Sequence, residues 1–84
     1  MKITQIRKEF IKGYTKGGRE KWILIEESQE EIDETTYLNT VKNKNPFGYE
    51  RQKKSYTRLG YTTTHICCVS PSGENKITYD FIIE

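Results

Sequence analysis

The most reactive side chains in this chain are a single histidine, His65, and two adjacent cysteines, Cys67 and Cys68. A nucleophilic hydrolase needs its nucleophile, its base and an orienting group within hydrogen-bond reach of one another. On a strand, His65 and Cys67 share a face but lie roughly 6.5–7 Å apart, too far for a direct hydrogen bond. We therefore expect His65 to be a structural or surface residue rather than half of a catalytic pair.

Metal binding and redox chemistry find little support in the sequence. Neighbouring side chains on a strand point to opposite faces, so Cys67 and Cys68 are expected to be reduced thiols, one half-buried and one buried. One histidine and two diverging cysteines are too few for a structural zinc site. The acids Glu30, Asp33 and Glu34 lack the glycine-containing loop that encloses a bound cation. We expect no metal, no cofactor and no enzymatic activity.

Charge patterning is more informative than the reactive groups. The net charge of +2 conceals an acidic block and a basic block that lie close together in the sequence. The acidic block consists of Glu26, Glu27, Glu30, Glu31, Asp33 and Glu34. Carboxylates are stabilised in the first turn of a helix, which explains part of this block. Six carboxylates also repel one another, so the block favours a surface that meets a basic partner protein.

The basic block provides an alternative binding surface. It consists of Lys42, Lys44, Arg51, Lys53, Lys54 and Arg58. Along an edge strand, alternation places Arg51 and Lys53 on one face and Lys54 and Arg58 on the other, and lysines there also deter aggregation. Aromatic rings among these charges, such as Tyr56, favour stacking on single-stranded nucleic acid. Residues Arg51, Lys53, Lys54, Arg58 and Tyr56 are therefore a candidate nucleic-acid-binding segment, although the pI of about 8.5 is below that of dedicated binders.

Length and composition predict one domain spanning residues 1–84. A chain of this size buries only about 60–65% of its unfolded surface, which allows one small core and leaves room for a homodimer. Ten Ile, ten Thr and six Tyr with no Ala favour strands over helices. The most apolar uninterrupted run, Trp22–Ile25, is too short to span a membrane, and no signal segment follows Met1. The expected location is cytoplasmic, either a bacterial-type cytosol or the cytosol of a host cell.

The hydrophobic pattern predicts an N-terminal hairpin followed by a helix. Residues 2–14 fit either a strand or a helix, but the Gly17–Gly18 pair before residues 20–27 indicates a tight reversal that joins two strands. The pattern of residues 21–27 is typical of a buried strand. Ser28 and Glu31 match a capping box, which predicts a helix of about three turns that ends in a loop at 43–49.

The second half of the chain predicts further strands. Residues 50–59 are basic, with Tyr56 and Leu59 as expected anchors, and residues 61–69 are rich in beta-prone side chains. The last strand is the clearest, because Ile77, Tyr79, Phe81 and Ile83 share one face. The expected fold is α+β: a small antiparallel sheet of four to five strands with one helix packed on one face, in the order ββαββ or ββαβββ.

Three short stretches carry a family resemblance: SYTRLGYTTT (55–64), SPSG (70–73) and YDF (79–81). Over its C-terminal half, the chain resembles short phage and plasmid proteins of low-GC Gram-positive bacteria. Some small proteins of this group are anti-CRISPR or other anti-defence inhibitors. The resemblance implies inhibition of a larger, nucleic-acid-handling host protein, such as a CRISPR nuclease, by occlusion of its surface. It transfers no functional residues, because the matching positions are turn and strand positions.

Overall fold

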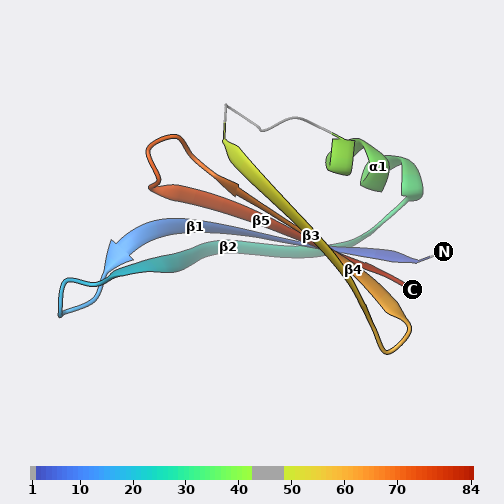
Figure 1. Cartoon of the computed structure of the whole chain (residues 1–84), viewed down its shortest axis with the longest axis horizontal. Helices are drawn as coiled ribbons and strands as arrows, with labels where there is room; N and C mark the ends of the chain where they lie inside the picture. Colours follow the sequence, from blue (N-terminus) through green and yellow to red (C-terminus); the bar gives the residue numbers. More distant parts are fainter. Residues whose placement is uncertain (1, 43–48) are drawn as a thin grey trace.

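The computed structural model describes residues 2–42 and 49–84, which contain five strands and one helix in the order ββαβββ (Figure 1). These elements are β1 (Ile3–Tyr14), β2 (Glu20–Ile32), α1 (Glu34–Lys42), β3 (Glu50–Arg58), β4 (Tyr61–Val69) and β5 (Asn75–Ile83). The prediction of a small α+β protein with an antiparallel sheet is confirmed. Most of the predicted loop at 43–49, including Lys44 of the basic block, lies outside the described residues.

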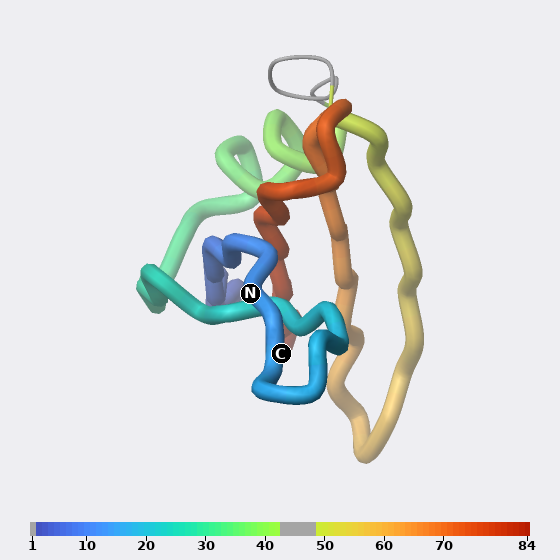
Figure 2. The backbone as a smooth tube through the Cα atoms, turned by 90° about the vertical axis from the view of Figure 1, so that its left-hand side faces the viewer, coloured from blue at the N-terminus to red at the C-terminus, as the bar shows by residue number. Residues whose placement is uncertain are grey.

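The described strands form one antiparallel sheet in the order β2-β1-β5-β4-β3. The last strand, β5, is thus the central one, between β1 and β4, while β2 and β3 form the two edges. The chain ends meet beside it, where the Glu84 amide donates to the Lys2 carbonyl at 3.0 Å. Figure 1 shows β3 and β4 crossing the direction of β1 and β2, as expected when right-handed twist accumulates across a sheet. In Figure 2 the β3–β4 hairpin accordingly stands away from the β1–β2 hairpin.

The fully buried apolar residues of the described chain lie on one face of the sheet, here called the core face. They are Ile3, Ile66, Cys68 and Phe81. The register aligns Phe81 with Gln5 on one side and with Thr64 on the other. From α1, the Tyr37 ring meets Phe81 edge-on at 5.1 Å between centroids, and its hydroxyl lies 3.1 Å from Thr64 Oγ1. Helix contacts and alternating strand residues therefore build one thin core.

The predicted helix start is wrong. Ser28 and Glu31 belong to β2, and the helix begins at Glu34 with Asp33 as its N-cap. The Thr36 amide donates to Asp33 Oδ1 at 2.7 Å, which satisfies one of the free amides of the first turn. Pairing with β1 continues to the end of β2, where Ile32 lies opposite the buried Ile3. The long ladder and this apolar anchor outweigh the local capping signal.

Two predictions about burial are also wrong. Residues 21–27 are exposed except for a half-buried Trp22, because they lie in the edge strand β2. Tyr56 and Leu59, the expected anchors, are 56% and 86% exposed. Leu59 and Gly60 have φ angles of 52° and 81° and form the two-residue turn between β3 and β4. By contrast, the N-terminal hairpin and the shared face of the alternate β5 residues are confirmed.

Candidate interaction surfaces on the two edges of the sheet

The acidic block lies along β2 and the start of α1, and the sheet divides it between two faces. The register places Glu26 and Glu30 on the core face, opposite Glu9 and Gln5 of β1. Glu27 and Glu31 alternate with them and point to the opposite face. Asp33 and Glu34 follow at the helix start. We call Glu26, Glu27, Glu30 and Glu31 the acidic edge, because all four are exposed on an outer strand.

No carboxylate of the acidic edge forms an ion pair within the described chain, although the register places Lys8 of β1 opposite Glu27. The ion pairs found there are Arg7–Glu9, Lys12–Glu20 and His65–Asp80. Glu30 accepts a 3.3 Å hydrogen bond from the Gln5 side-chain amide, which leaves its charge intact. Asp33 differs from these residues, because the Thr36 amide lowers its pKa by hydrogen bonding to the carboxylate. Asp33 is thus a capping residue, whereas the four carboxylates of the acidic edge are exposed and form no ion pair in the described chain.

An exposed apolar segment adjoins the acidic edge on β2. The ladder between β1 and β2 shifts at Glu9–Phe10, so that Glu26 and Leu24 have partners while Ile25 between them has none. Leu24 is 45% exposed and Ile25 is 53% exposed. Their hydrophobicity had indicated a buried strand, so their availability to a partner was missed. Only the strand order, which places β2 at the edge, reveals it.

The basic segment occupies the other edge of the sheet. As predicted, β3 alternates Arg51 and Lys53 with Lys54 and Arg58, and the register places the first pair on the core face, opposite Cys68 and Ile66. Arg51 donates to the Val41 carbonyl at the end of α1 and is therefore engaged in the fold. The other three cations, Lys53, Lys54 and Arg58, are exposed, and we call them the basic edge.

Tyr56 lies between Lys54 and Arg58 on the same side of β3, since these residues are two positions apart. The residue is 56% exposed. An exposed ring between two cations is an arrangement on which a nucleobase can stack while the adjacent phosphates meet positive charge.

His65 lies on β4 opposite Asp80 of β5, with Nδ1 2.6 Å from Asp80 Oδ1. This contact orients the imidazole, and it was missed because pairing of the two residues requires the register of β4 and β5. Cys67 is on the same face, but the described residues include no hydrogen bond between it and His65. Both cysteines are free, Cys67 half-buried and Cys68 buried as predicted, and burial raises the pKa of the Cys68 thiol.

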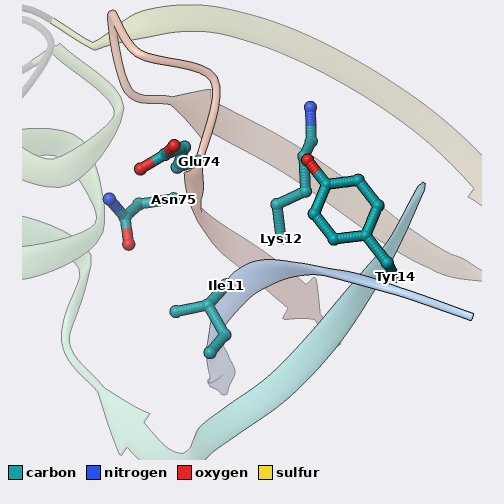
Figure 3. Close-up of a pocket in the computed structure, with 5 residues that line it drawn as sticks. All are labelled: Ile11, Lys12, Tyr14, Glu74 and Asn75. Carbon is teal, nitrogen blue, oxygen red and sulfur yellow. The ribbon is translucent and has the colours of Figure 1, made fainter. Parts of the chain in front are cut away.

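A shallow pocket of about 250 Å³ lies near the end of β1 and is lined by Ile11, Lys12, Tyr14, Glu74 and Asn75 (Figure 3). Figure 3 shows the Lys12 and Tyr14 side chains on one side of β1 and Ile11 on the other. Lys12 Nζ is 3.3 Å from a Glu20 carboxylate oxygen and lies over the ring of Trp22. The Lys12 ammonium group therefore already has partners within the β1–β2 hairpin. The two charged edges are the stronger candidate sites.

Comparison of the chain with protein-family models, curated proteins and solved structures finds no match. Among the described residues, no helix is both long enough and apolar enough to cross a membrane. Function has to be inferred from the geometry and charge of the two edges themselves.

Proposed function

We propose that this chain is a small, non-enzymatic interaction protein of a phage or other mobile element. It inhibits a larger, nucleic-acid-handling host protein, such as a CRISPR nuclease, by occluding its surface in the bacterial cytoplasm. The observation that carries this proposal is the acidic edge: exposed carboxylates without ion pairs in the described chain, next to exposed Leu24 and Ile25.

The two parts of β2 have complementary roles in this proposal. The carboxylates steer the protein toward a basic groove and accelerate association, since complementary charge acts mainly on encounter. Leu24 and Ile25 provide apolar area at the contact, where binding energy concentrates in desolvated residues. The outer side of β2 also offers backbone amides and carbonyls to which a partner strand can add. Helix α1 contacts the core face through Tyr37, which meets Phe81 and Thr64.

Charge reversal at Glu27 and Glu31 tests the proposal. Neither carboxylate has a hydrogen-bonding or ionic partner among the described residues, so the double variant E27K/E31K is expected to fold normally. Its capture of nucleic-acid-handling proteins from a Gram-positive bacterial lysate should fall by about tenfold or more, as read by quantitative mass spectrometry. The matched control is E74K/E84K, which changes net charge equally at exposed positions away from β2.

Two outcomes contradict the proposal. One is equal capture by the wild type and E27K/E31K, which would show that the acidic edge is not the contact. The other is a wild-type capture set without nucleic-acid-handling proteins. Circular dichroism and melting curves of both variants exclude a trivial loss of folding.

A second candidate function, nucleic-acid binding by an accessory protein, is supported by the exposed Tyr56 between Lys54 and Arg58. A gel-shift assay with a single-stranded oligonucleotide tests it. Affinity should fall steeply as salt rises, because neutralised phosphates release counterions. The variant Y56A should weaken binding with little change in the salt dependence, because it removes a stacking ring. The variant K54Q should make the salt dependence less steep, because it removes a phosphate contact. Absence of binding at about 50 mM salt excludes this alternative.

A further inference from the structure

The two outer strands of the sheet carry opposite charge. Strand β2 has five glutamates and one lysine, whereas β3 has four cations and one glutamate. In the described sheet each of them has a single neighbour, β1 for β2 and β4 for β3. One side of each strand therefore lacks a cross-strand ladder. Unpaired edges are templates for strand addition, and like charges protect an edge only against a copy of itself.

We propose that β2 of one copy of this chain pairs with β3 of a second copy, antiparallel, and thereby extends the sheet from molecule to molecule. The segment 26–32 aligns with 52–58 in a seven-residue ladder. In that register three pairs of opposite charge face one another: Glu26 with Arg58, Glu30 with Lys54, and Glu31 with Lys53. No pair of like charge occurs within the ladder.

The faces of the two strands agree with this register. Antiparallel pairing of β2 with β3 turns the second copy over, so that the core face of one copy continues into the opposite face of the next. Glu26 and Glu30 lie on the core face, and their partners Arg58 and Lys54 lie on the opposite face. Glu31 and Lys53 have the reverse placement. Every charged pair therefore comes together on the same side of the joined sheet.

The alternative pairings are less favourable. Joining two β2 strands or two β3 strands brings like charges together across the interface, which is destabilising. A parallel β2–β3 ladder also forms three opposite-charge pairs, Glu26–Lys53, Glu27–Lys54 and Glu31–Arg58. Antiparallel ladders are slightly more stable per residue, so the antiparallel arrangement is favoured.

The contact is heterologous, because different surfaces of the two copies meet. Any assembly built this way keeps a free acidic edge at one end and a free basic edge at the other, so growth does not stop at a dimer. This inference does not depend on the proposed host partner. It does use the same acidic edge, so self-association and partner binding compete.

Sedimentation equilibrium tests the inference. The weight-average mass should rise from the 9.9 kDa monomer to at least about twice that value as the concentration approaches about 0.5 mM at low salt. It should return to the monomer value near 0.5 M salt, where the Debye length is only about 4–5 Å. A protein that remains a monomer throughout the low-salt series overturns the proposal.

Charge-swapped variants give a sharper test. In the proposed register E26K/E31K places lysines opposite Arg58 and Lys53, and K53E/R58E places glutamates opposite Glu31 and Glu26, so each variant alone should remain monomeric. An equimolar mixture should associate again, since both the native and the swapped contacts form in it. A structural defect in either variant cannot produce such rescue. A mixture that stays monomeric overturns the proposal.

Cysteine cross-linking tests the direction of pairing, in a Cys67→Ser background. Mixing E30C with K54C should yield a disulfide-linked dimer, because the antiparallel register places these positions opposite each other. Cross-linking of E27C with K54C instead indicates the parallel ladder and overturns the antiparallel arrangement. A third outcome is a protein that stays monomeric, binds an oligonucleotide, and loses that binding in the Lys54→Gln variant. This result would assign the basic edge to nucleic acid rather than to a second copy, and it would overturn the proposal.

Discussion

Strands β5 and β2 each contain five apolar or aromatic side chains, but they differ sharply in burial. In β5 four of them, Ile77, Tyr79, Phe81 and Ile83, alternate along one face, and Phe81 is completely buried. In β2 four of them are consecutive, from Trp22 to Ile25, and Ile25 is 53% exposed. The difference arises because β5 lies between two strands and β2 has one described neighbour. Burial here follows position in the sheet more closely than local hydrophobicity.

The central strand β5 stabilises the fold, whereas the edge strand β2 is available for binding. The apolar residues of β5 contact β1, β4 and α1, so they hold together segments that are distant in sequence. In β2, Ile32 packs against the core, whereas Ile23, Leu24 and Ile25 stay exposed near the unpaired carboxylates. An apolar edge strand would ordinarily promote aggregation, and the carboxylates of the acidic edge oppose its pairing with a second β2 strand by charge repulsion. The same composition thus stabilises the fold in one strand and leaves a surface available for binding in the other.

The largest expected effect is on stability, from truncation of the central strand. Phe81→Ala should lower the free energy of unfolding by about 3–5 kcal/mol, because it leaves a cavity in a core with few other buried side chains. Ile25→Ala, at the exposed bulge of β2, should change it by less than about 0.5 kcal/mol. Urea denaturation of both variants measures the contrast. Similar losses would mean that β2 carries as much of the core as β5.

Features of the fold that depend on neighbouring residues could be predicted from the sequence, whereas features that depend on contacts between distant residues could not. Local alternation was sufficient to predict the face of β5 that carries Phe81, and the opposite environments of Cys67 and Cys68. The helix start was not predictable in this way, because Ser28 and Asp33 both precede a plausible first turn. The choice between them depends on the distant pairing of Ile32 with Ile3.

The candidate site follows the same division. The sequence identified both charged blocks and the alternation of the basic residues, since charge and strand period are local properties. It assigned Glu30 and Glu31 to a helix and the Trp22–Ile25 run to the interior, because the strand order cannot be read from local patterns. That the two charged strands form opposite edges of one sheet is a property of the pairing alone.

Two thiols lie on opposite faces of β4, the strand beside β5, and are expected to react at different rates. Cys68 is buried against the core, and burial raises its pKa, so it stays protonated at neutral pH. Since the thiolate is the reactive form, iodoacetamide should alkylate Cys68 at least about tenfold more slowly than the half-buried Cys67. Mass spectrometry of timed digests measures both rates. Equal rates would place Cys68 outside the core.

A smaller effect is expected where β2 ends and α1 begins. Hydrogen bonds from Thr36 lower the pKa of Asp33, so its stabilisation of the fold is complete above the ordinary aspartate pKa. It is lost as the pH falls through the lowered pKa of the folded state. Asp33→Ala should therefore lower the melting temperature at pH 7, and the difference from the wild type should shrink as the pH falls through the lowered pKa of Asp33.

Asp33→Ser is the matched control for this pH dependence. Serine also accepts a hydrogen bond at the N-cap but does not titrate in this range. Its melting temperature should stay close to that of the wild type at pH 7, and the gap to Asp33→Ala should not close with acid. A gap between Asp33→Ala and the wild type that is independent of pH would contradict the role of the ionised carboxylate.

The smallest effect is expected at Leu59, in the turn that connects β3 to β4. Its φ of 52° is unfavourable for a leucine, and its side chain is 86% exposed, so it gains little from packing. Asparagine before glycine is preferred in such two-residue turns. Leu59→Asn should therefore raise the free energy of unfolding by about 0.5–1 kcal/mol in urea titrations. Leu59→Ala retains the backbone strain and should give no comparable gain; a gain from both would point to the removed apolar side chain instead. In that case the exposed apolar side chain of Leu59 would oppose folding slightly, whereas the buried side chain of Phe81 in β5 stabilises the fold.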